Sequence, residues 1–117
     1  DAGAAFVFTR SAGVWSQQAV LTSSTAAAGD TFGWTVGLSG DAAVVGSPLD
    51  DTAATNAGAA DVFTRTGASW AHAARLQAPA PGENDRFGYS VSLAGAIVAV
   101  GAPDEDGSGA QVNPAHD

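Results

Sequence analysis

Hydrophobic and polar residues alternate along two short segments of the chain, 34–38 and 89–93. In each segment an aromatic residue, a valine and a leucine occupy every second position, and glycine, serine or threonine lies between them. This period of two predicts a β-strand with one bulky face and one face of small residues. Continuous runs of small apolar residues follow at 42–46 and 97–101, as is typical of strands that are covered on both faces.

Two prolines mark the ends of these apolar runs. Pro48 and Pro103 follow them closely, and proline has no N–H group to donate to a sheet. Two further strands are predicted at 59–64 and 70–76, with a turn at 66–68 between them. No segment shows helical periodicity, so each unit is predicted to hold four strands.

The whole pattern occurs twice. Segment 32–48 returns without a gap as 87–103, so position 87 repeats position 32 at an offset of 55 residues. Segment 3–10 returns as 58–65 at the same offset. A repeat unit cannot bury its apolar face alone, so the core is expected between stacked units.

A repeated antiparallel unit of four strands is what a β-propeller blade requires. The repeated residues also resemble the FG-GAP repeat, which is found in integrin α-subunit propellers and in many bacterial surface proteins. The residues that carry this resemblance are Phe32, Gly33, Gly46, Pro48, Phe87, Gly88, Gly101 and Pro103. The resemblance implies an all-β fold of four-stranded propeller blades in which the Phe-Gly strand is innermost.

If blades start at Phe-Gly, the chain divides into three parts. Residues 1–31 supply the last two strands of a preceding blade and a loop, 32–86 one complete blade and a loop, and 87–117 the first two strands of a following blade and an acidic tail. A closed propeller needs about four to eight blades. The chain is therefore expected to be a fragment of an array, or a unit completed by other copies. The expected partners are the remaining blades of its own chain or copies of itself.

Composition narrows the classes of partner. The net charge is −8, with four arginines and no lysine, which argues against nucleic acid and against anionic membrane surfaces. The chain has no cysteine, so no disulfide framework or thiol chemistry is predicted. No apolar run approaches the roughly 18 residues of a membrane span, so no membrane insertion is expected. The resemblance and the acidic composition favour an extracellular or cell-surface location.

Acidic residues gather in the loops after the two Gly-x-Pro segments. Asp50 and Asp51 follow the first, and Asp104 and Asp106 follow the second. Such loops can collect the oxygen ligands that calcium prefers, but acidic loops also keep an apolar protein soluble, and both interpretations stay open. Integrin-type repeats carry calcium between the Phe-Gly and Gly-Ala-Pro strands. Here that connection is a short turn in both copies, so the resemblance implies no calcium at that place.

Four aromatic residues are candidates for contact with a ligand. Trp15 and Trp70 lie on the outermost predicted strand, and Trp34 and Tyr89 begin the alternating segments. Aromatic faces suit carbohydrate and protein partners alike, although residues at equivalent positions of a repeat also serve packing. Trp15 and Trp70 are retained as candidate surface contacts.

Other repeated positions favour structural roles. Asp30 and Asp85 precede Phe-Gly by two residues and are expected to accept hydrogen bonds from nearby backbone N–H groups. Gly33 and Gly88 are expected to have positive φ or no room for a Cβ atom.

Two positions invite more than one interpretation. Arg10 and Arg65 could bridge neighbouring units, but are expected at the solvent edge. Position 6 of the first copy is phenylalanine, whereas its counterpart Asp61 must meet solvent or a partner specific to its blade.

No catalytic arrangement is visible in the sequence. His72 and His116 have no partner at metal-ligand spacing, and no Ser-His-Asp or Cys-His set is present. The chain is therefore expected to be a non-catalytic extracellular repeat module for adhesion, structural display or protein or glycan binding. The alternatives are a scaffold propeller of a larger glycan-processing enzyme and a self-assembling unit that forms a polymer. No cofactor is expected, with calcium the single candidate.

Overall fold

The computed structural model describes residues 2–23, 25 and 27–105. These residues contain strands, turns and loops. None of them belongs to a helix long and apolar enough to cross a membrane. The strands are β1 (Ala5–Ser11), β2 (Val14–Leu21), β3 (Thr35–Ser39), β4 (Ala42–Ser47), β5 (Ala59–Thr66), β6 (Ser69–Leu76), β7 (Ser90–Ala94) and β8 (Ile97–Gly101).

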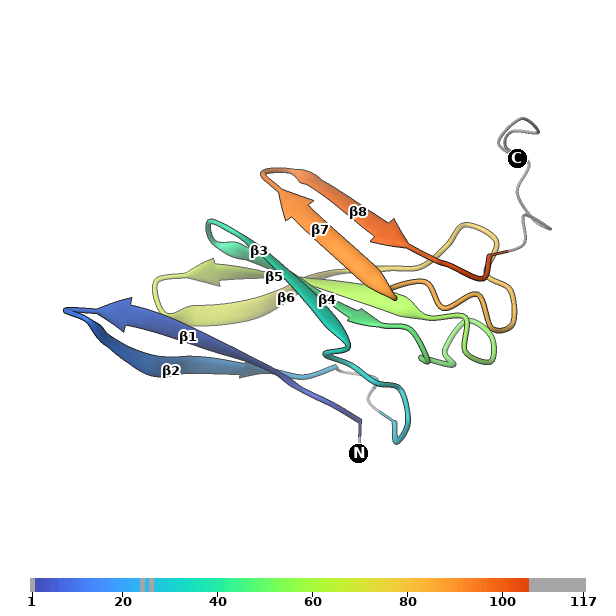
Figure 1. Cartoon of the computed structure of the whole chain (residues 1–117), viewed down its shortest axis with the longest axis horizontal. Coiled ribbons are helices and arrows are strands. Elements are labelled where there is room, and N and C mark those ends of the chain that lie inside the picture. Colours follow the sequence, from blue (N-terminus) through green and yellow to red (C-terminus); the bar gives the residue numbers. More distant parts are fainter. Residues whose placement is uncertain (1, 24, 26, 106–117) are drawn as a thin grey trace.

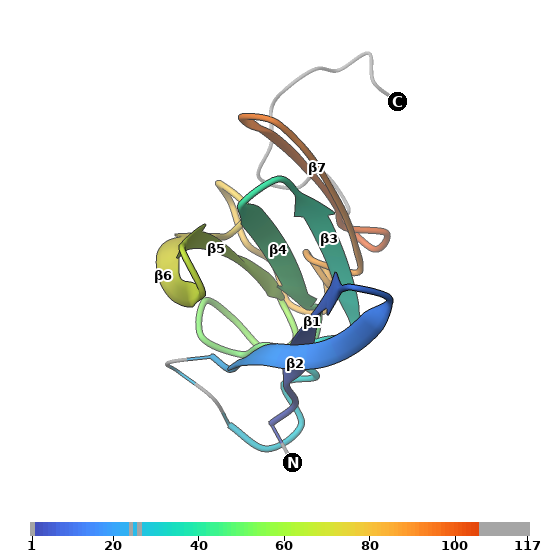
Figure 2. The ribbon, with the colours of Figure 1, turned by 90° about the vertical axis from the view of Figure 1, so that its left-hand side faces the viewer.

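All strand pairs within the three sheets are antiparallel, which confirms the predicted fold class. The central sheet has the order β3-β4-β5-β6, and β1-β2 and β7-β8 form separate two-stranded sheets. The hairpins β1-β2 and β7-β8 lie on opposite sides of the central sheet in both views (Figures 1 and 2). The molecule is therefore a stack in which one complete unit lies between two half-units.

The Phe-Gly segments join successive units through the backbone. Single parallel bridges link Gly3 to Phe32 and Gly58 to Phe87. The Phe87 N–H donates to the Ala57 carbonyl at 2.8 Å, and the Phe32 N–H makes the equivalent bond with the residue before Gly3. The start of each inner strand is thus fixed against the third strand of the preceding unit.

Gly33 and Gly88 lie at these junctions, as predicted. Their φ angles are +96° and +97°, in the left-handed region that side chains disfavour. A Cβ atom would lie 2.4 Å from the Ala4 carbonyl oxygen at Gly33 and 2.3 Å from the Ala59 carbonyl oxygen at Gly88. Both the backbone conformation and the close approach of a neighbouring unit therefore require glycine.

The main core lies between β1-β2 and the central sheet, as expected for stacked units. Its buried members come from both units, namely Ala5, Leu21, Phe32, Ala43, Val45 and Phe63. Phe32 meets Phe63 edge-on, with ring centroids 6.2 Å apart and an interplanar angle of 85°. This arrangement of two aromatic rings is favourable because the positive edge of one ring faces the π-cloud of the other.

A second interface joins β3 to β7. The small residue Gly37 allows close approach, since a Cβ atom there would lie 3.5 Å from the Leu93 backbone nitrogen. Val91 and Leu93 on the bulky face of β7 are half-buried, and Val44 of β4 is fully buried. The small face of one inner strand therefore receives the bulky face of the next.

Candidate functional site

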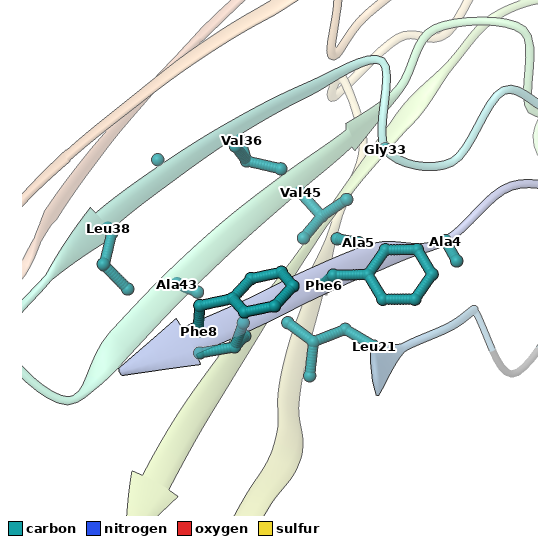
Figure 3. Close-up of a pocket in the computed structure, with 12 residues that line it drawn as sticks. Ala4, Ala5, Phe6, Phe8, Leu21, Gly33, Val36, Leu38, Ala43 and Val45 are labelled. Atoms are coloured by element: carbon teal, nitrogen blue, oxygen red, sulfur yellow. The ribbon is translucent and has the colours of Figure 1, made fainter. Parts of the chain in front are cut away.

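An apolar groove lies beside β1, along the exposed bulky face of β3 and the adjoining buried residues Ala43 and Val45 of β4 (Figure 3). Its volume is about 420 Å³. The larger side chains that line it are Phe6, Val7 and Phe8 of β1, Leu21 of β2, Val36 and Leu38 of β3, and Val45 of β4. The groove follows from the alternation in β3, because the bulky residues face one way and the small residues face β7.

The β3 residues at this groove are more exposed than their counterparts in β7. Val36 and Leu38 are 58% and 65% exposed, whereas their counterparts Val91 and Leu93 are half-buried against β3. The residues have the same identity and register, so the difference lies in what covers them. The bulky face of β7 is covered by β3 of the central unit. In the described part of the chain, no inner strand of a preceding unit covers the bulky face of β3 at the groove.

Two strand edges that are paired in the central unit are open in the half-units, within the described residues. In the described residues, β1 pairs with β2 alone and β8 pairs with β7 alone. The counterpart of β1 in the central unit is β5, the counterpart of β8 is β4, and these two strands also pair with each other. An unpaired edge presents free N–H and C=O groups to any strand that can align with it. The groove and the β1 edge adjoin, so a hairpin placed there would meet both.

A buried charged cluster occupies the outer half of the central unit. Arg75 of β6 contacts Asp50 at 2.5 Å and Asp61 of β5 at 3.2 Å. His72 Nε2 lies 2.8 Å from the same Asp61 carboxylate. Asp50 and Asp61 are each 1% exposed. One guanidinium group therefore bridges two buried carboxylates from different parts of the chain.

Hydrogen bonding in this cluster shifts two pKa values. Burial alone would raise the pKa of Asp50, but hydrogen bonds from Thr52 and Arg75 outweigh it and hold that pKa below its ordinary value. Burial alone would lower the pKa of Arg75, but the two carboxylates raise it, so the guanidinium group stays charged. Asp50 and Arg75 are therefore both charged at neutral pH. Their ion pair holds the loop that carries Asp50 against β6.

The cluster is specific to this unit. Counting back 55 residues, Asp61 corresponds to Phe6 and Arg75 to Val20. The sequence left open whether Asp61 meets solvent or a partner specific to its blade, and the structure gives it Arg75 and His72 of the same unit. Sequence reasoning missed Arg75. The departure from the repeat at both positions was the signal that could have revealed the pair.

Asp30 and Asp85 accept backbone hydrogen bonds, as predicted. The Ala27 N–H donates to Asp30 at 3.2 Å, and the Gly82 N–H donates to Asp85 at 2.7 Å. Burial, followed by the charge of Asp50, raises the pKa of Asp30 above its ordinary value of 3.8. The ionised form of Asp30 therefore costs stability in the folded protein.

We expect Asp30→Asn to raise the free energy of unfolding at pH 7. Asparagine keeps an oxygen that can accept from the Ala27 N–H group but carries no charge to desolvate. Because the folded-state pKa of Asp30 is raised, the wild type should recover this loss as the pH falls through that pKa. Urea denaturation at a series of pH values measures the difference. A gain that is constant from pH 7 to pH 4 would contradict the electrostatic explanation.

Arg65 corrects an expectation from the sequence. It does not simply flank a turn at the solvent edge, because it donates to Gln18 of β2 at 3.2 Å and to Asp41 at 2.7 Å. Gln18 also accepts from the Trp70 indole at 2.8 Å. A polar bridge thus connects the first half-unit to the central unit.

The two candidate contact tryptophans have different environments. Trp70 is half-buried, packs against the core and has Arg65 5.4 Å from its ring centroid. Trp15 is 64% exposed, with Arg10 5.9 Å from its ring centroid. Surface contact through either residue stays a prediction, and Trp15 has the larger free surface.

The structure brings Trp34 and Tyr89 together. Their ring centroids are 5.6 Å apart with a tilt of 46°, although 55 positions separate them in the sequence. They are 54% and 41% exposed. Stacking of the units therefore places two exposed aromatic rings side by side.

The candidate calcium ligands do not form one cluster. Asp50 binds Arg75, Asp51 accepts from the Asn56 N–H at 2.7 Å, and Asp104 lies 3.3 Å from Arg86. Among residues 2–23, 25 and 27–105, no three acidic, histidine or cysteine side chains are placed to share a metal ion. Asp106 and His116 lie outside the described residues.

Comparison with known families adds one finding. The family model of the FG-GAP repeat matches residues 15–63 and 70–113, which together make up well over half of the chain. The first match runs from β2 into β5, and the second from β6 beyond β8. No curated protein matches the chain.

Proposed function

The chain belongs to the FG-GAP repeat family, and we propose that it is a non-catalytic extracellular binding module built from β-propeller blades. Its role is to present a fixed face of stacked units to a glycan, in adhesion or in display at a cell surface. An extracellular location is compatible with a chain that has no cysteine and a net charge of −8. The same charge disfavours nucleic acid as the ligand.

The observation that carries this proposal is the exposed pair Trp34 and Tyr89. Each ring lies directly before the inner strand of a successive unit and next to the junction at Gly33 or Gly88, so these backbone junctions fix the spacing of the rings. Rigid aromatic rings offer a large apolar contact area at a small cost in conformational entropy. The apolar face of a pyranose ring fits such a platform, and the phenol and indole groups add hydrogen bonds at its rim.

The test is a binding screen with the full chain against immobilised neutral oligosaccharides. For the glycan that binds best, we expect Trp34→Ala and Tyr89→Ala each to weaken binding by about tenfold or more, equivalent to roughly 1.4 kcal/mol. The control is Val14→Ala, which removes an exposed apolar side chain of the β1-β2 hairpin and should retain wild-type affinity. Glycan binding that survives both substitutions would contradict the platform, and an array with no bound glycan would contradict the ligand class.

A further inference from the structure

We propose that the groove beside β1 is filled by the β7-β8 hairpin of a second copy of this chain, so that copies associate head to tail. The hairpin of one copy and the β1-β2 hairpin of the other would then form one composite four-stranded blade. This inference goes beyond the proposed ligand and does not depend on it. Each of its contacts has a counterpart that is already present within one chain.

The faces that would meet are complementary. Within the chain, Gly37 on the small face of β3 packs against the β7 backbone at Ser92 and Leu93, and the bulky side chains of Val91 and Leu93 are half-buried. On β7 the residues equivalent to the small face of β3 are Ser90, Ser92 and Ala94, and all three are exposed. Laid into the groove of a second copy, this small face would cover the exposed side chains of Val36 and Leu38 in the same way.

The open edges define the register of the composite blade. Within the central unit, Ala42 pairs with Thr64 and Val44 pairs with Val62. The offset of 55 residues converts these pairs into Ile97 with Thr9 and Ala99 with Val7. Antiparallel pairing of β8 with β1 of the second copy would therefore close both edges at one interface.

An aromatic contact would be reproduced at the same interface. Phe63 is 5% exposed because Phe32 and the core cluster cover it, whereas its counterpart Phe8 is 52% exposed. The counterpart of Phe32 is Phe87, which starts the segment that leads into β7. In the assembly Phe87 of one copy would lie against Phe8 of the other. The exposed apolar side chains along β1 and β3 thus share one explanation.

The contact is heterologous, because β7-β8 of one copy meets β1 and β3 of the next. Such contacts generate closed rings if the rotation closes, and filaments if it does not.

The first test is sedimentation of the purified chain at micromolar concentration. We expect the wild type to sediment as an oligomer or polymer, and Leu38→Glu to raise the dissociation constant by roughly 100-fold or more, since a carboxylate would be buried without a partner. The control is Val14→Glu, because Val14 is also 65% exposed but lies in the β1-β2 hairpin away from the groove. A wild-type chain that is monomeric, folded or not, would overturn the proposal, and so would a Leu38→Glu variant that assembles like the wild type.

The second test examines the register and uses the absence of native cysteine. Thr9→Cys combined with Ile97→Cys should form disulfides between copies under mild oxidation, giving a ladder of multimers on a non-reducing gel. In the control pair, Arg10→Cys with Ile97→Cys, the two side chains point to opposite faces of the sheet and should cross-link far less. Equal cross-linking of the two pairs, or none in either, would overturn the proposed register.

Discussion

Replacing Arg75 with alanine is expected to lower the free energy of unfolding by about 3–5 kcal/mol at neutral pH. The guanidinium group is the shared partner of Asp50 and Asp61, and both carboxylates are almost completely buried. Without Arg75 the two buried charges would lose their shared cation and keep only the hydrogen bond from Thr52 and the contact with His72, which is more costly than the loss of a surface ion pair. Denaturant unfolding followed by circular dichroism measures the change.

The effect of Arg75→Ala should depend on pH. Since the pKa of Asp50 is held below its ordinary value of 3.8, the stabilisation is present above that value and is lost as the pH falls through the folded-state pKa. The difference between wild type and Arg75→Ala should therefore narrow below about pH 4.

The matched control for this prediction is Arg86→Ala. Arg86 pairs with Asp104 at 3.3 Å, and the two side chains are 46% and 50% exposed. Such a pair is expected to contribute at most about 1 kcal/mol. Equal losses in Arg75→Ala and Arg86→Ala would show that burial of the cluster has no special role.

Gly88→Ala is expected to cost about 3 kcal/mol or more. A left-handed conformation costs alanine about 1–2 kcal/mol, and the added Cβ atom would also lie 2.3 Å from the Ala59 carbonyl oxygen. The clashing atom belongs to the backbone of the preceding unit, so relief requires movement of the junction between units. Thermal unfolding at fixed protein concentration should show a large drop in Tm.

Gly95→Ala separates the two contributions to this cost. Gly95 also has a positive φ, +56°, but no atom lies within 4 Å of the Cβ position. This substitution should therefore carry only the conformational cost of about 1–2 kcal/mol. If Gly88→Ala is no less stable than Gly95→Ala, close packing at the Phe-Gly junction does not limit stability.

The repeated features could be predicted from the sequence because they obey local rules that both copies share. Alternation of bulky and small residues in 34–38 and 89–93 is sufficient to identify strands and their two faces. Gly33 and Gly88 occur at the same position of each copy, as do Asp30 and Asp85. This repetition indicated a structural role, and the positive φ of Gly88 and the hydrogen bond to Asp85 agree with it. The offset of 55 residues further indicated that the core would lie between units.

The charged cluster and the aromatic pair required the tertiary structure. Asp50, Asp61 and Arg75 occupy positions where the two copies differ, and their contacts join a loop to two strands. A pattern along the chain gives the residue types, but the charges interact only over a few ångströms in space. Trp34 and Tyr89 were visible as equivalent residues, but their contact depends on how the units stack.

The same limit applies to the groove. The sequence by itself determined that Val36 and Leu38 share a bulky face, and that this face is equivalent to the face of Val91 and Leu93. Only the tertiary structure decided that one face is covered and the other exposed. Alternation specifies the direction of each side chain relative to its strand, whereas burial depends on which neighbouring sheet occupies the space beyond it.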